Sequence, residues 1–131
     1  MNPQIKQQWL AALKSGEYHQ GRKFLRYQKD YNDTYQCYCC LGVLCDLAVK
    51  AGVTTWEEID KDNDGDEQLT NKVSRWAGLQ SLNPEISLQV LEPEETKNDN
   101  WTLRISHLND GDFAIRPRNF DEIHDIIEKY L

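Results

Sequence analysis

The stretch that decides the fold is YCCLGVLCDLA, which occupies residues 38–48. Leu41, Leu44 and Leu47 recur at intervals of three, so they lie on one face of a helix. A glycine at position 52 supplies a C-terminal stop for that helix. The pattern therefore predicts a buried central helix over residues 40–51.

The same kind of pattern predicts a helix at each end of the chain. Near the N-terminus, Asn2 can cap a helix whose apolar residues recur at helical spacing as far as Gly16. Near the C-terminus, Asn119 is a capping residue, and Glu122 follows at the third helical position, as in a capping box. We therefore expect a first helix that ends before Gly16 and a last helix that begins after Asn119.

Shorter segments lie between these three helices. Aromatic content favours a strand over residues 18–27, and residues 35–39 can pair back onto it as a hairpin. The rest of the chain predicts a short helix, an acidic loop, one or two helical turns and two strands, over residues 56–59, 60–68, 71–79, 86–91 and 101–108 respectively. Together the elements predict an α+β fold, a single compact domain of residues 1–131 with a small, mostly antiparallel sheet.

Composition and charge limit the functions that this chain can have. It has 131 residues, of which 39% are hydrophobic, enough to bury one core. No apolar run approaches the roughly 18–20 residues that cross a bilayer, and the opening residues MNPQIK lack the apolar stretch of a signal peptide. We therefore expect a cytoplasmic protein with no membrane partner. The net charge of −7 argues against general nucleic-acid binding, because phosphate backbones repel it.

The four cysteines lie within nine positions, at Cys37, Cys39, Cys40 and Cys45. Cysteines this close cannot staple distant loops, so reduced thiols are expected rather than disulfides. A zinc site is disfavoured as well, because the adjacent Cys39 and Cys40 are poorly placed to reach one tetrahedral ion. We expect neither a metal nor a cofactor.

Four segments, in order, resemble a family of small phage and prophage proteins. The segments are YCCLGVLCDLA, WLAALKSGEY, WAGL and the LND that precedes the last helix, at residues 38–48, 9–18, 76–79 and 108–110. This chain departs from the family pattern by carrying extra residues, 111–119, before the last helix. The resemblance implies a viral origin and specifies no reaction.

One cysteine arrangement leaves a catalytic alternative open. Cys40 (or Cys39) stands at a helix start, where the helix N-terminus lowers the pKa of a thiol, and His107 downstream can take the proton. Asn109 or Asp110 then completes the chain order of papain-like hydrolases. The competing interpretation is that these cysteines are small buried hydrophobes.

Residues 60–66 begin like a calcium-binding loop. Asp60, Asp62 and Asp64 occupy the first, third and fifth positions, and a glycine occupies the sixth. The twelfth position is Asn71, where a bidentate glutamate is needed, so calcium affinity should be poor. A solvated turn is the expected structure.

Basic residues are scarce in this chain, and they form two groups. The candidate ligand-binding residues are Arg22, Lys23, Arg26, Tyr27, Arg116 and Arg118. Arginines can bind a phosphate or carboxylate bidentately, and neighbouring aromatic rings can stack on a base. The alternative is that these arginines pair with surface carboxylates.

These observations lead to one functional hypothesis and two alternatives. We expect a non-enzymatic, phage-encoded binding protein that sequesters an anionic small molecule, such as a signalling nucleotide, to counter a host defence. One alternative is a cysteine hydrolase or transferase that uses Cys40 and His107. The other is an inhibitor that binds a host protein directly. A homo-oligomer is compatible with each of them.

Overall fold

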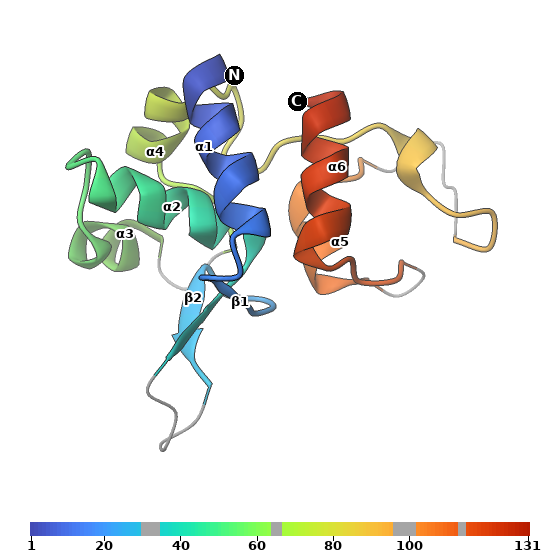
Figure 1. Cartoon of the computed structure of the whole chain (residues 1–131), viewed down its shortest axis with the longest axis horizontal. Helices are drawn as coiled ribbons and strands as arrows, with labels where there is room; N and C mark the ends of the chain where they lie inside the picture. The colour runs from blue at the N-terminus through green and yellow to red at the C-terminus, as the bar shows by residue number, and fades with distance from the viewer. Residues whose placement is uncertain (30–34, 64–66, 96–101, 113–114) are drawn as a thin grey trace.

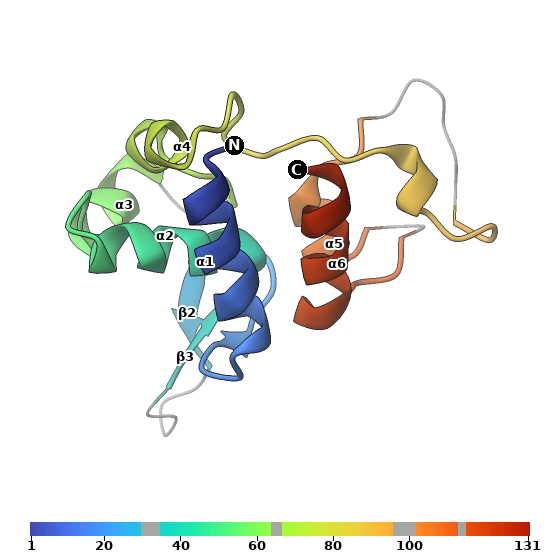
Figure 2. The same ribbon diagram turned by 45° about the horizontal axis from the view of Figure 1, so that its top comes forward.

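The computed structural model describes residues 1–29, 35–63, 67–95, 102–112 and 115–131. Within them the chain forms six α-helices and a three-stranded mixed sheet, an α+β arrangement as predicted. Figure 1 shows α1 and α6 side by side with the two chain ends near one another, and Figure 2 shows the same arrangement after a 45° turn. The first and last helices of the sequence therefore close the fold against each other.

Helix α1 (Pro3–Lys14) begins where the sequence predicts. The Asn2 side chain accepts the backbone N–H groups of Gln4 and Ile5, at 2.9 and 3.2 Å. The indole of Trp9, which is fully buried, donates to the carbonyl of Cys40 at 2.9 Å. This bond fixes α1 against the start of the central helix.

The sheet comprises β1 (His19–Gln20), β2 (Arg26–Gln28) and β3 (Gln36–Tyr38), in the order β1-β3-β2. Strands β2 and β3 pair antiparallel, as the predicted hairpin requires, whereas β1 pairs parallel to β3. The prediction of one continuous strand over residues 18–27 is wrong, because residues 21–25 leave the sheet as a loop.

The central helix, α2 (Cys40–Lys50), confirms the prediction from the opening stretch. The Cys39 sulfur accepts the Gly42 N–H at 3.3 Å and so caps the helix. Leu41 and Leu44 are completely buried, whereas Leu47 is only partly buried.

Two further helices follow α2. Helix α3 (Trp56–Asn63) runs one turn further than predicted, so the acidic loop does not begin at residue 60. Helix α4 (Asn71–Ala77) is capped by the Thr70 hydroxyl and ends at Gly78, whose φ of +69° favours glycine.

The second half of the chain corrects two predictions. Residues 86–91 do not form a strand but contain the short 3-10 helix η1 (Leu88–Val90). Residues 102–108 do not form a strand either, because helix α5 (Ile105–Asp110) begins there. Helix α5 starts where His107 Nδ1 accepts the backbone N–H of Arg104 at 3.1 Å.

Helix α6 (Phe120–Tyr130) has the predicted capping box. Asn119 Oδ1 accepts the N–H of Glu122 at 2.9 Å, and the Glu122 carboxylate accepts the N–H of Asn119 at 3.3 Å. Its apolar face buries Phe120, Ile123 and Ile127. None of the helices that the structure describes is long and apolar enough to span a bilayer.

Candidate binding surface

Two basic and two aromatic side chains lie in the loop between β1 and β2 and in β2 itself. We call Arg22, Lys23, Phe24 and Tyr27 the basic–aromatic surface. Phe24 is 50% exposed and is the one exposed large hydrophobic residue in the described part of the chain. Its ring meets the Tyr27 ring edge to face, with centroids 5.8 Å apart. Aromatic rings beside cations are typical of surfaces that bind ligands or partners.

Hydrogen bonds to the end of α5 hold this loop in place. Arg22 Nη1 donates to the Asn109 carbonyl at 2.6 Å, and the Lys23 N–H donates to Asp110 Oδ1 at 2.9 Å. Lys23 has a φ of +73°, which side chains other than glycine rarely adopt. Such a conformation persists when surrounding contacts impose it, and strained residues of this kind often lie at functional sites.

Asn109 is the anchor that joins this loop to the central helix. Its side chain is completely buried, and its Oδ1 accepts from the Cys40 N–H at 3.1 Å and from Gln20 Nε2 at 3.0 Å. Its Nδ2 donates to the Gly21 carbonyl at 2.9 Å and to Asp110 Oδ1 at 2.8 Å. All four hydrogen-bonding positions of the amide are therefore used.

Close packing fixes both ends of the same loop. A Cβ on Gly21 would lie 2.6 Å from the Tyr27 ring and 2.8 Å from the Cys37 side chain. A Cβ on Gly42 would lie 1.6 Å from the carbonyl oxygen of Leu25. Glycine at both positions is required for the loop to sit this close to β3 and α2.

The charges of this surface retain donors for a ligand. A guanidinium has five N–H donors, and Arg22 commits one of them to the Asn109 carbonyl. Within the described residues the Lys23 ammonium makes no hydrogen bond or ion pair, and the side chain is exposed. Asp110 adds one negative charge nearby, and it accepts N–H groups from Lys23 and Asn109.

The structure places Arg26 away from this group. Arg26 and Tyr27 are neighbours on β2, so their side chains point to opposite faces of the sheet. The Arg26 guanidinium lies 4.1 Å from the centre of the Trp56 ring.

Asp46 accepts two hydrogen bonds behind this ring contact. Trp56 donates to Asp46 Oδ1 at 2.9 Å, and Tyr18 donates to Asp46 Oδ2 at 2.6 Å. Burial and the bond to Asp46 raise the pKa of Tyr18 to about 12.

The side chain of Arg118 is also committed elsewhere, although its carbonyl accepts from Gln20 Nε2 at 2.8 Å. It is 2% exposed and forms a bidentate ion pair with Glu95, which is itself buried. The hydrogen bonds from Arg118 lower the pKa of Glu95 to about 2. Arg118 therefore pairs with a carboxylate, but with a buried one and not with a surface carboxylate as the alternative expects.

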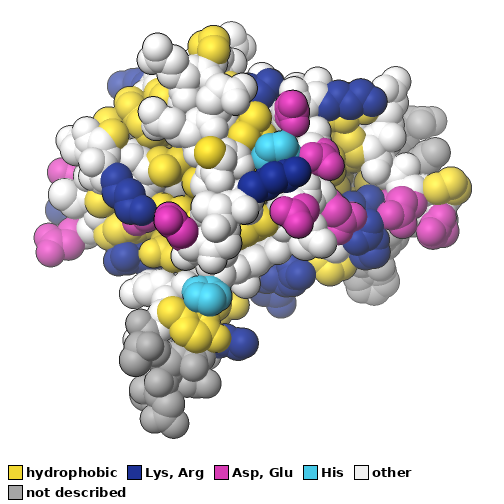
Figure 3. Space-filling model, in the orientation of Figure 1, with side chains coloured by type: hydrophobic (Ala, Val, Ile, Leu, Met, Phe, Trp, Pro, Cys, Tyr) yellow, Lys and Arg dark blue, Asp and Glu magenta, His cyan; other side chains and the backbone are white. Residues whose placement is uncertain are grey.

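Arg116 is paired as well, at the surface. Its guanidinium contacts Glu92 at 2.8 Å and Glu122 at 2.7 Å. Figure 3 shows Lys and Arg side chains interleaved with Asp and Glu side chains over the side of the molecule that carries α6. Arg116 and Arg118 thus belong to ion pairs and do not converge with Arg22 and Lys23.

The burial of Cys40 argues against the catalytic alternative. All four cysteines are free and buried, in agreement with the expected reduced thiols. Cys40 is 0% exposed, and burial raises the pKa of its thiol well above the ordinary value. A protonated thiol out of reach of substrate is a poor nucleophile. Asn109 is committed to structural hydrogen bonds, and His107 accepts from the backbone of Arg104.

The calcium candidates are not arranged as a loop. Asp60 and Asp62 lie in α3, whereas a calcium loop needs its first and third ligands in irregular backbone. Asp64 lies outside the described residues. The interpretation of this segment as a solvated turn is wrong for residues 60–63, which are helical.

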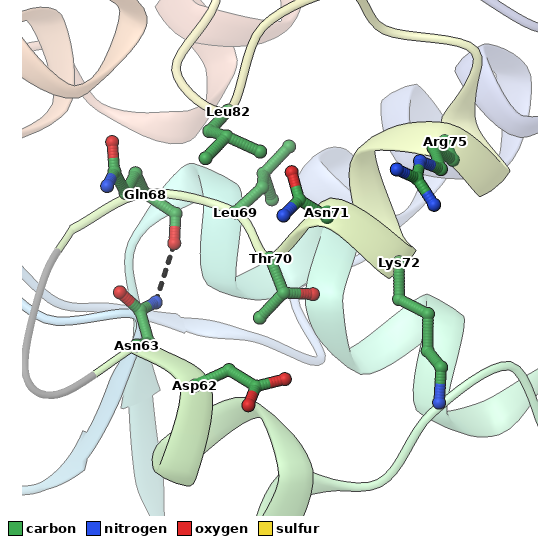
Figure 4. A pocket seen from close by; sticks show the side chains of 9 residues that line it. All are labelled: Asp62, Asn63, Gln68, Leu69, Thr70, Asn71, Lys72, Arg75 and Leu82. Carbon is green, nitrogen blue, oxygen red and sulfur yellow. Dashed lines mark hydrogen bonds between the residues drawn. The ribbon is translucent and has the colours of Figure 1, made fainter.

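A small polar pocket of about 280 Å³ lies between α3 and α4. Figure 4 shows that Lys72 and Arg75 extend from α4 in different directions, so their charges do not converge in it. Lys72 is paired with Glu58 at 2.9 Å, and Asn63 spans the pocket floor to the Gln68 carbonyl at 2.6 Å. The pocket lacks the convergent donors that an anion requires.

No curated protein and no solved structure matches the chain. A family model matches all of it, residues 1–131. The chain belongs to the family described as Domain of unknown function (DUF8296).

Proposed function

We propose that this chain is a non-enzymatic binding protein that captures a nucleotide-like anion on the basic–aromatic surface. The observation that carries the proposal is the half-exposed Phe24 ring, which follows Arg22 and Lys23 in the chain, on a loop that hydrogen bonds and close packing hold in place. A preformed surface binds with less loss of conformational entropy than a mobile one.

Each part of the ligand has a matching group. Phosphate oxygens accept from the remaining Arg22 donors and from the Lys23 ammonium. A base stacks on the Phe24–Tyr27 pair, which offers about 1–3 kcal/mol per stacked base. The overall charge of −7 repels a long phosphate backbone, so a short ligand is favoured over DNA or RNA.

The test is calorimetry with a panel of cyclic and linear nucleotides at rising salt. Lys23→Gln removes a charge that makes no hydrogen bond or ion pair in the described part of the chain. We expect it to weaken nucleotide binding about ten-fold or more, as loss of a charged hydrogen bond does. Phe24→Ser should also weaken binding. Arg75→Gln, an exposed arginine on α4, is the matched control and should bind as the parent does. Affinity should fall as salt screens the charges.

The outcome that contradicts the proposal is equally clear. Nucleotides that produce no heat, or that bind Lys23→Gln and the parent equally, would refute capture at this surface. A ligand recovered in altered form would replace capture with catalysis. Lack of nucleotide binding would leave direct docking on a host protein, which an exposed Phe24 at a loop tip also fits. A role against host defence rests on the resemblance to phage proteins and stays a prediction.

A further inference from the structure

Helix α6 brings three metal-ligating side chains together on its exposed face. His124 Nδ1 lies 2.9 Å from Asp125 Oδ1 and 3.8 Å from Glu128 Oε2. One ligand atom from each residue lies within 4.8 Å of the others. The cluster is separate from the basic–aromatic surface, which lies on the loop between β1 and β2.

These distances are close to those around a single bound ion. Zinc takes nitrogen and oxygen ligands at about 2.0–2.2 Å, so two ligands of one ion lie roughly 3–3.5 Å apart. The His124–Asp125 separation of 2.9 Å and the His124–Glu128 separation of 3.8 Å lie on either side of that range. The carboxylates are 72% and 64% exposed, so small rotations can bring both onto the ion.

The histidine supplies the less mobile ligand. Its side chain is only 15% exposed, on the helix that packs against α1. Asp125 Oδ1 accepts a hydrogen bond from His124 Nδ1 at 2.9 Å, so Nδ1 carries the proton in that contact. In a neutral imidazole the proton can move to Nε2, and the Nδ1 lone pair is then available to a metal. One imidazole nitrogen with two carboxylates suits zinc and similar divalent transition metals, whereas magnesium and calcium prefer all-oxygen sites.

A lysine of α1 provides an internal competitor. Lys14 Nζ lies 3.8 Å from Asp125 Oδ1, and both side chains are largely exposed. The ammonium and a metal ion therefore share one carboxylate. Removing the lysine charge should strengthen metal binding, whereas removing a ligand should weaken it.

We propose that His124, Asp125 and Glu128 form a surface site for one divalent transition-metal ion, with zinc as the best-matched probe. Water completes the coordination, because α6 supplies three protein ligands. A metal ion that binds the folded chain and not the unfolded chain also raises the melting temperature, by mass action.

The experiment titrates the full chain with zinc chloride by calorimetry and follows the melting temperature in parallel. We expect one zinc ion per chain, with affinity reduced at least ten-fold by His124→Ala and reduced by Glu128→Gln. Lys14→Gln should tighten binding about two-fold, the scale of an exposed ion pair. Asp121→Asn removes another exposed carboxylate of α6 and is the matched control, which should bind as the parent does.

Three results would overturn the proposal. They are the absence of zinc binding, equal affinity of the parent and His124→Ala, and calcium binding as tightly as zinc. Circular dichroism of each variant without metal separates loss of the site from loss of the fold.

Discussion

Replacing Asn109 with aspartate tests how the loop is held, because it changes one atom of a completely buried side chain. The substitution keeps the oxygen that accepts from the Cys40 N–H but turns the Nδ2 donor into a second acceptor. That new oxygen faces the Gly21 carbonyl and the Asp110 carboxylate, at the sites now 2.9 and 2.8 Å from Nδ2. The Gly21 carbonyl and the new oxygen are then left without a donor, whereas Asp110 Oδ1 keeps the N–H of Lys23. Each buried acceptor without a donor costs about 1–3 kcal/mol, so we expect the free energy of unfolding to fall by about 3–4 kcal/mol.

Urea denaturation at pH 7, followed by tryptophan fluorescence, measures this loss directly. The new carboxyl is buried beside Asp110, so its pKa is raised on folding, and the deficit should grow as pH rises above about 4. Asn119→Asp is the matched control, because Asn119 is an exposed cap that acts through its oxygen and aspartate caps equally well. A loss below about 1 kcal/mol for Asn109→Asp, or equal losses for the two variants, would refute the anchoring role.

Two further predictions concern packing and charge. A glycine-to-alanine change stabilises an exposed helix by about 1 kcal/mol. Gly42→Ala should instead destabilise the fold by about 3 kcal/mol or more in urea melts, because the added carbon would lie 1.6 Å from the Leu25 carbonyl oxygen. A stabilised variant would contradict this. Glu95→Gln should lower the free energy of unfolding by about 3 kcal/mol at pH 7, because folding lowers the pKa of Glu95 from 4.5 to about 2. The difference from the parent should persist above pH 4.5 and vanish as the pH falls through 2. A difference independent of pH would show that Arg118 contributes nothing through charge.

The helices could be predicted where their determinants are local. Asn2 and Asn119 cap helices whose apolar faces repeat within a few residues, and both begin where the sequence indicates. The central helix follows for the same reason. The contact that fixes its start against α1 could not be predicted, because the bond from Trp9 to the Cys40 carbonyl joins residues far apart in the chain.

The strand predictions failed where distant contacts override alternation. Residues 102–108 largely alternate apolar and polar side chains, yet they enter α5, where the Ser106 hydroxyl accepts from the distant Asn83 Nδ2 at 2.8 Å. A local bond, from the Arg104 N–H to His107 Nδ1, adds to this contact at the start of the helix. Aromatic content likewise favoured one strand over residues 18–27, but Gly21 and the contacts to α5 turn the chain out of the sheet. The exposed Phe24 had a local signal, since it interrupts the apolar–polar alternation there.

The basic–aromatic surface carries the cations that the rest of the described fold does not pair. In the described part of the chain, Arg118 is consumed by Glu95, Arg116 by two surface glutamates, and Arg26 by the Trp56 ring. Sequence grouping cannot foresee these fates, because each partner except Glu122 lies more than twenty residues away. Arg22 donates one N–H to the Asn109 carbonyl of α5, and Lys23 bonds Asp110 through its backbone N–H. These bonds hold the loop and leave most of the cationic donors unused. Arg22 and Lys23 are followed in the chain by the exposed Phe24 ring, and the anionic ligand that we propose needs both the charge and the stacking surface.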